Sequence, residues 1–168
     1  SEIYLLLIQG TAAGPTDASS GSAWTTPSAL IDNTDTTGAK FHYLIGRGSL
    51  GTAAETIQTG ARNAESVTSR EFTLTFTVFD IADPLVYDYC RDLQCGSKKP
   101  RIMYASEGGW LYCKVGASTA ADNGIQTKSV TVSFPKDEGK EAVDRAVITM
   151  KWDALTDPDR VVNPLTLG

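Results

Sequence analysis

Two segments of the chain alternate between apolar and hydroxyl-bearing residues. The segments "EFTLTFTVFD" and "TKSVTVSF" both repeat this pattern with a period of two residues. Successive side chains of a strand point to opposite faces of a sheet, so the pattern predicts two strands, each with one buried face and one exposed face. The exposed faces would carry the uncharged hydroxyls of Thr73, Thr75, Thr77, Ser129, Thr131 and Ser133.

Shorter apolar runs predict the remaining strands. They lie at residues 3–8, 41–45, 101–105, 110–115 and 143–152. The turn sequence "SEGG" joins the third and fourth of these runs into a hairpin, and "ADNG" marks another turn. In the last run the inward set is Ala146, Ile148, Met150 and Trp152.

One helix is predicted between two capping signals. Asp83 followed by Pro84 is typical of an N-cap and first helical position, and Gly96 is suited to end the helix. The apolar residues expected on its inward face are Leu85, Val86, Tyr89 and Leu93. With about seven strands and one flanking helix, the expected fold is mainly β, an antiparallel β-sandwich or partly closed barrel.

Low-complexity segments rich in Gly, Ser and Thr separate these elements. They predict long loops at about 9–40 and 46–70, the second with no more than a turn of helix at 53–58. The Pro-containing end, 153–168, is expected to be an extended tail. No repeat or linker divides the chain, so residues 1–168 are expected to form a single domain.

Charge and cysteine content narrow the classes of function. The 168 residues carry a net charge of −5, which argues against binding nucleic acid through its phosphates. Three cysteines without paired spacing argue against a disulfide framework. The first apolar run lacks a basic flank and is too short for a signal peptide or a membrane span.

The spacing Gly46-Arg47-Gly48-Ser49-Leu50-Gly51 matches G-x-G-x-x-G, a dinucleotide-binding fingerprint. That site requires a crossover helix directly after the glycines and a buried parallel strand. Here a polar segment follows, and the next strand alternates with threonines. We therefore interpret these glycines as a hinge into a loop, and expect no cofactor.

Candidate catalytic and metal-binding residues are few. His42 is the only histidine and lies in a predicted strand, and no G-x-S-x-G elbow accompanies it. A zinc site of His42 with Cys90, Cys95 and Cys113 would miss the usual ligand spacing. The segments "IDNTDTTG" and "SKKPR" are better interpreted as a solvated turn and a helix-terminal basic cluster than as calcium or nucleic-acid sites. We expect neither an enzyme nor a metal site.

The order of elements resembles that of the phage tail tube, or major tail, protein family, which is related to the inner-tube proteins of contractile injection systems. The resemblance rests on an alternating strand followed by "FDIADP", a single helix, a basic pair and a hairpin, and then on "TKSVTVSFPKDEG". As a layout it covers roughly residues 41–152.

This resemblance implies a virion structural protein of the tail, assembled in the host cytoplasm into stacked hexameric rings through which DNA passes without specific binding. The hydroxyl faces named above would line the lumen. The 46–70 segment would reach the neighbouring ring, with ring-stacking residues Gly46, Arg47, Gly48, Gly51, Gly60 and Arg62. Partners would be other copies of the chain and tape-measure, tail-terminator and baseplate proteins, with no membrane.

Two other classes stay open at this stage. One is a different phage structural protein, such as a capsid decoration or minor tail protein. The other is a secreted β-sandwich adhesin or lectin, which an export signal or bridging disulfides would favour. A small hydrolase is third, and it would require His42 to be essential.

Overall fold

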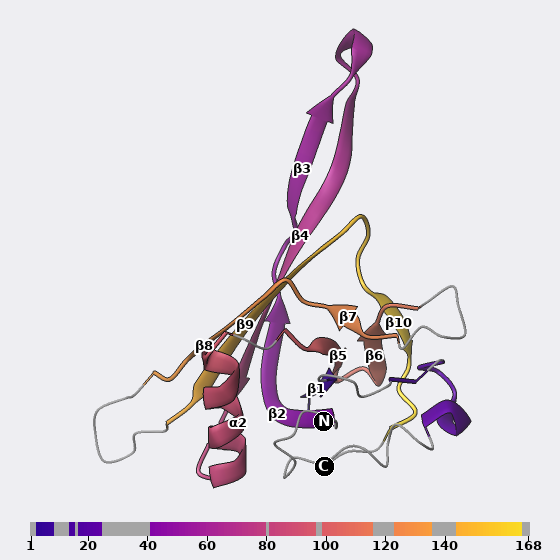
Figure 1. Ribbon diagram of the computed structural model, residues 1–168. Coiled ribbons are helices and arrows are strands. Elements are labelled where there is room, and N and C mark those ends of the chain that lie inside the picture. The colour runs from indigo at the N-terminus through magenta and orange to yellow at the C-terminus, as the bar shows by residue number, and fades with distance from the viewer. Residues whose placement is uncertain are drawn as a thin grey trace.

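Ten strands form one antiparallel sheet in the computed structural model, which describes residues 3–8, 14–15, 17–24, 41–79, 81–96, 99–115, 123–135 and 144–165 (Figure 1). The order along the sheet is β10-β6-β5-β1-β2-β4-β9-β8, with β3 paired to β4 and β7 paired to β5. The strands are β1 Ile3–Ile8, β2 Phe41–Leu50, β3 Ala54–Thr59, β4 Glu65–Val78, β5 Arg101–Ala105, β6 Trp110–Cys113, β7 Ile125–Gln126, β8 Ser129–Ser133, β9 Ala146–Ala154 and β10 Asp159–Val162. The predicted fold class, mainly β with one flanking helix, is confirmed.

The predicted helix is α2, Pro84–Gln94, and its N-cap is Asp83, whose side chain accepts a hydrogen bond from the Leu85 backbone N–H at 3.0 Å. Gly96 follows with a φ of +73°, a conformation that glycine adopts without strain. The predicted inward position of Leu85 is wrong, because that side chain is 42% exposed and Cys90 is buried instead. The packed face of α2 consists of Val86, Tyr89, Cys90 and Leu93, which are three or four residues apart, and Leu85 lies just outside this face.

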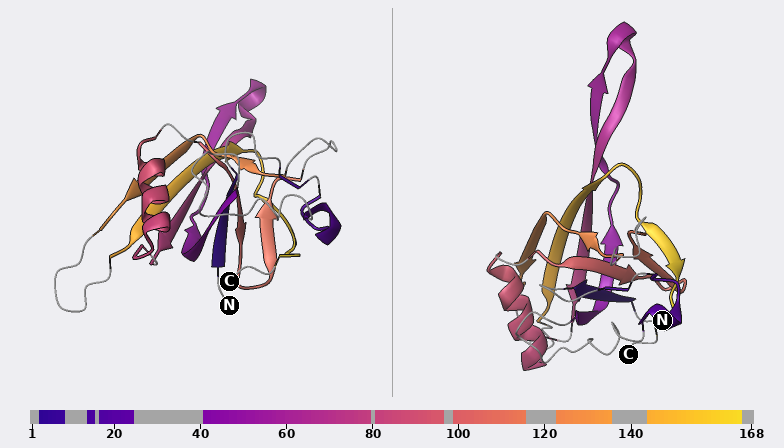
Figure 2. Two further views of the ribbon diagram at one scale, coloured as in Figure 1. Left: turned by 60° about the horizontal axis from the view of Figure 1, so that its bottom comes forward. Right: turned by 45° about the vertical axis from the view of Figure 1, so that its right-hand side comes forward.

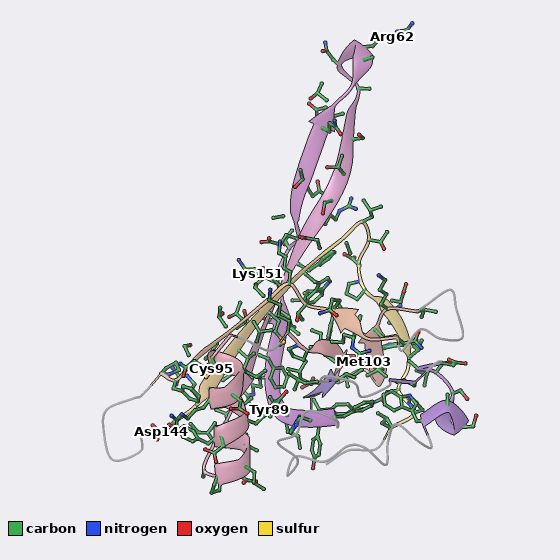
Figure 3. The ribbon with its side chains drawn as sticks, viewed as in Figure 1. Arg62, Tyr89, Cys95, Met103, Asp144 and Lys151 are labelled. Carbon is green, nitrogen blue, oxygen red and sulfur yellow. The ribbon has the colours of Figure 1, made fainter. Side chains whose placement is uncertain are left out.

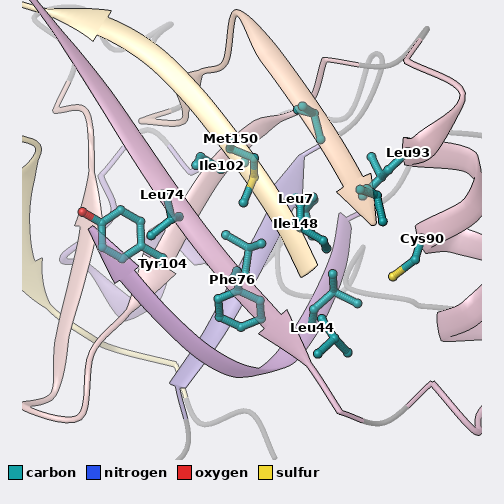
Figure 4. Close-up of a cluster of buried hydrophobic side chains, with 14 of the residues drawn as sticks. Leu7, Leu44, Leu74, Phe76, Cys90, Leu93, Ile102, Tyr104, Ile148 and Met150 are labelled. Carbon is teal, nitrogen blue, oxygen red and sulfur yellow. The ribbon is translucent and has the colours of Figure 1, made fainter. Parts of the chain in front are cut away.

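The sheet curls around a large hydrophobic cluster. Strands from distant parts of the sheet order, including β5 and β8, contribute to this one cluster, as does α2 (Figure 4). A barrel-like curl therefore buries the inward residues predicted in β4 and β9. The two 3-10 helices described, η1 Gly21–Trp24 and η2 Ala61–Asn63, lie outside this cluster.

A second cluster covers the outer face of β1, β5 and β6. Trp24 and Ala18, from the segment before β2, pack there against Tyr4, Phe41 and other strand residues. The indole N–H of Trp24 donates a hydrogen bond to the Ala18 carbonyl at 3.0 Å. Both faces of β1 are thus buried, which explains its continuous apolar run. Part of the predicted 9–40 loop is therefore packed, while residues 25–40 lie outside the described chain.

The predicted loop at 46–70 is wrong, because a long β-hairpin occupies it. β2 continues to Leu50, and β3 then pairs with the first half of β4 from Ala54↔Glu71 to Thr59↔Glu65. The hairpin projects well beyond the curled body of the sheet (Figures 1 and 2). Every residue of β3 is exposed, so neither a buried face nor an apolar period identifies it in the sequence.

The predicted extended tail at 153–168 is also partly wrong. β9 runs on to Ala154, and β10 pairs with β6 from Asp159↔Cys113 to Val162↔Trp110. The hairpin around "SEGG" is confirmed: Gly109 has a φ of +78°, and the Ser106 N–H donates to the Trp110 carbonyl at 2.9 Å. In the "ADNG" turn, Asn123 has a φ of +59°, and residues 121–122 are outside the described chain.

Candidate functional site

The register of four neighbouring strands brings the predicted hydroxyl residues onto one face. Thr75 of β4 lies opposite Thr149 of β9, which lies opposite Thr131 of β8. On the other side Thr75 lies opposite Ser49 of β2. A row of four hydroxyl residues therefore crosses β2, β4, β9 and β8.

Two flanking rows complete this face. One runs from Thr73 through Lys151 to Ser129, and the other from Thr77 through Val147 to Ser133. We call the outer surface of β2, β4, β9 and β8 the hydroxyl face; its members are Arg47, Ser49, Thr73, Thr75, Thr77, Ser129, Thr131, Ser133, Val147, Thr149 and Lys151. All six residues predicted to lie on the lumen wall are in this set.

The hydroxyl face is open to solvent in the single chain. Its residues are half-buried or exposed, whereas Leu74, Phe76, Ile148 and Met150 on the other face are at most 2% exposed. The helix α2 packs on the inner side, in the cluster that contains Tyr89. Among the described residues, the segment around Trp24 packs on the outer surface of β1, β5, β6 and the first part of β2.

An ion-pair cluster lies at the end of the face nearest the hairpin. Lys128 Nζ lies 2.9 Å from Asp153 Oδ1 and also bonds to Glu71, while Lys151 Nζ lies 3.7 Å from Glu71 Oε1. Lys151 lies near the base of the hairpin (Figure 3). The hydrogen bond and the charge of Lys128 lower the pKa of Glu71, and the hydrogen bond to Glu71 raises the pKa of Lys128. Each lysine of this cluster is thus balanced by a carboxylate. The sequence patterns did not predict this cluster, although Glu71 has the same parity as the predicted Thr73.

Arg47 lies toward the other end of the face, in β2 and not in a loop. It is exposed, lies opposite Thr77, and its guanidinium carbon is 6.0 Å from the centre of the Phe79 ring. Gly46 and Gly48 flank it within the same strand. The interpretation of Gly46 as a hinge into a loop is therefore wrong.

Gly46 instead marks a corner of the sheet. Residues of β2 up to Gly46 pair with β1, and residues from Gly46 onward pair with β4. A Cβ at Gly46 would lie 2.0 Å from the Thr77 carbonyl oxygen, and one at Gly48 would lie 2.8 Å from the Phe76 ring. Glycine is required at such a corner because the neighbouring strand approaches so closely.

The other predicted ring-stacking residues lie along the hairpin. Gly51 donates its N–H to the Thr73 carbonyl at 3.2 Å at the base, and Gly60 donates to the Ala64 carbonyl at 2.7 Å near the tip. Arg62 is at the tip itself, exposed and with a φ of 61° (Figure 3). The six predicted residues thus separate into a corner, a base and a tip.

The residues considered for catalysis and zinc binding do not meet. His42 is buried and stacks on Tyr89 of α2, with ring centres 3.9 Å apart and planes 10° apart. Cys90 and Cys113 are buried in different clusters, where burial raises the pKa of each thiol to about 11, and Cys95 is exposed. Within the described chain no group of three or more His, Cys, Asp or Glu side chains could hold a metal ion. The segment 31–38, considered for calcium, and residues 97–98 of the basic cluster lie outside the described chain.

The glycine fingerprint also lacks its structural context. A dinucleotide site needs a helix after the third glycine, and here the chain enters β3, antiparallel to β4. Comparison with known proteins finds no protein family, no curated protein and no solved structure that matches the chain. Among the described residues, no helix has the length and apolar character needed to cross a membrane.

Proposed function

We propose that this chain is a structural subunit of a viral tail tube, which self-assembles into stacked hexameric rings that conduct DNA. The observation that carries the proposal is the hydroxyl face: four adjacent strands present an uncovered surface in which uncharged hydroxyls predominate. Other copies of the chain would be its main partner, and tape-measure, tail-terminator and baseplate proteins would be further ones. The protein would be part of the virion tail.

The chemistry of this face suits a wall along which DNA slides. Binding of DNA is dominated by release of counterions when Lys and Arg neutralise phosphates. Lys128 and Lys151 are balanced by Glu71 and Asp153, and the Thr75 row contains no charged residue. The remaining cation of the face as defined here is Arg47, which lies toward its other end. Together with the net charge of −5, this leaves little attraction for a polyanion.

The hairpin supplies a second reason to propose self-assembly. A two-stranded ribbon is only marginally stable in water by itself, and this one exposes Ile57 to 54%. Its base is tied to the sheet, because Arg70 contacts both Glu55 and the Leu155 carbonyl. Contact with a second subunit would bury Ile57 and the open edge of β3, and we propose that the hairpin joins successive rings.

Negative-stain electron microscopy of the purified full chain tests the proposal. We expect rings or tubes about 10 nm across, the scale of six domains of this size in a ring. An Ile57→Asp variant should lose stacking into tubes, whereas Leu85→Asp, at a similarly exposed position on α2, should retain it. Trimers would favour a capsid decoration protein instead. Monomers over a wide concentration range would reject the proposal.

A further inference from the structure

A cleft of about 370 Å³ lies beside the base of the hairpin. Its walls are Leu50 at the end of β2, the β2–β3 connection at 51–53, the aromatic residues Phe72, Tyr104 and Tyr112, and the segment Asp157–Pro158. This volume falls in the range of small-molecule sites, which are mostly apolar with a few polar groups. The cleft is on the inner side of the sheet, away from the hydroxyl face, so the surface proposed to conduct DNA does not include it.

The hydroxyl group of Tyr104 is a buried polar group at this cleft. Tyr104 is 9% exposed, and its hydroxyl oxygen finds no hydrogen-bond partner within the described chain. Figure 4 shows this hydroxyl pointing away from the hydrophobic cluster that the ring joins. Buried polar groups are nearly always paired, so an unpaired one at a cleft points to a partner that is not part of the chain.

Burial and two neighbouring groups keep this hydroxyl neutral. Desolvation, followed by the influence of Tyr112 and Asp157, raises the pKa of Tyr104. The neutral Tyr104 hydroxyl keeps lone pairs on its oxygen, and these can accept a hydrogen bond from a cationic N–H. Asp157 is exposed, lines the same cleft, and makes no ion pair with any residue in the described ranges.

Two of the aromatic rings at the cleft belong to neighbouring strands, β5 and β6. The rings of Tyr104 and Tyr112 stack with centres 4.9 Å apart and planes 9° apart. Arg160 lies opposite Tyr112 in the register and places its guanidinium 4.5 Å from the centre of the Trp110 ring. The same sheet face thus already holds one guanidinium on an aromatic ring, where the ring quadrupole attracts it.

We propose that this cleft binds an ammonium or guanidinium group carried on an apolar stem. The stem would lie against Phe72, Tyr112 and Pro158. The cationic group would pair with the Asp157 carboxylate and donate a hydrogen bond to the Tyr104 hydroxyl oxygen. Such a group could be part of a free amine or of a Lys or Arg side chain of a second copy.

The test is an NMR titration of the full chain with benzylammonium, with benzyl alcohol as the uncharged counterpart. We expect saturable shifts at residues around the cleft with benzylammonium and at least about tenfold weaker binding of the alcohol. Asp157→Asn should weaken benzylammonium about tenfold and Tyr104→Phe several-fold. Asp88→Asn, an equal charge change on α2, should leave the affinity unchanged. Equal binding of both probes, no saturable shift, or no effect of either cleft variant would overturn the proposal.

A second measurement distinguishes the two sources of the cation. Sedimentation of the wild-type chain is followed with and without saturating benzylammonium. Loss of self-association with the probe would identify a side chain of a second copy as the occupant, and unchanged self-association would identify a free ligand. If rings form normally but benzylammonium causes no saturable NMR shifts at the cleft, this binding site is rejected and the proposed function is unaffected.

Discussion

Gly46 and Thr77 are in such close contact that a Cβ at position 46 would lie 2.0 Å from the Thr77 carbonyl oxygen. This contact is at the point where β2 exchanges β1 for β4 as its partner. The corner determines where the hydroxyl face begins, because residues of β2 beyond it pair with β4. Its geometry therefore connects the stability of the fold to the position of the candidate site.

Gly46→Ala is expected to destabilise the protein by about 1–3 kcal/mol, since backbone must shift to admit the methyl group. Gly60→Ala is the matched control, because its added Cβ would lie 3.5 Å from the Ala64 carbonyl, an ordinary contact, and it should change stability by less than about 1 kcal/mol. Urea unfolding monitored by circular dichroism measures both. Equal midpoints for the two variants would show that the corner tolerates a side chain.

Placing lysines on the hydroxyl face should make assembled tubes retain DNA. We expect the double variant Thr75→Lys with Thr131→Lys to bind labelled duplex DNA. The slope of the logarithm of its binding constant against the logarithm of salt concentration should be steeper by about 0.9 for each phosphate contacted. Ala82→Lys with Leu85→Lys adds the same charge at exposed positions near and on α2, outside the face. Equal DNA retention by the two double variants would mean that DNA does not meet the hydroxyl face. In a phage, the first variant should also slow ejection.

Arg47→Glu is expected to impair tube assembly without unfolding the chain. Arg47 is exposed beside Phe79, so reversal of its charge should change the free energy of unfolding by no more than about 0.5 kcal/mol. The new negative charge would repel an acidic group of another subunit that Arg47 attracts. Arg47→Lys keeps the charge and should assemble. Sedimentation reports assembly, and urea unfolding reports the fold. Normal tubes from the Glu variant would exclude Arg47 from the interface.

The pair Glu71–Lys128 should contribute to stability in a defined pH range. The pKa of Glu71 is lowered below its ordinary value of 4.5, so the contribution is present above that value and is lost as the pH falls through the lower folded pKa. Lys128→Met should flatten the fall in unfolding free energy between about pH 5 and pH 3. Lys99→Met, another exposed lysine, should leave that slope as in the wild type. If the unfolding free energy falls equally steeply with decreasing pH in both variants, the Glu71–Lys128 pair does not contribute to stability in this range.

Structural features that depend on a pattern within one segment could be predicted from the sequence. The alternation at residues 72–78 predicted which side of β4 carries hydroxyls, and Asp83 with Pro84 predicted where α2 begins. The hairpin could not be predicted in this way, because β3 has no buried face and therefore no apolar period. The same reasoning applies to β10, where Pro158 beside the strand suggested a broken tail.

The composition of the hydroxyl face depends on pairings between distant segments. Ser49 and Thr149 join the face only because β9 lies between β4 and β8, and because β2 pairs with β4 beyond its corner. The glycines at that corner suggested a loop, since glycine usually weakens a strand. Here the Phe76 ring occupies the space that a side chain at position 48 would need.

Electron-microscopic reconstruction of the assembled chain would show which surface faces the lumen of the proposed tube. We expect a tube of stacked hexameric rings in which the row Ser49–Thr75–Thr149–Thr131 faces the lumen and the β3–β4 hairpin contacts the next ring. A reconstruction with this row on the outer surface or buried between subunits, or a sample that never forms rings, would contradict it.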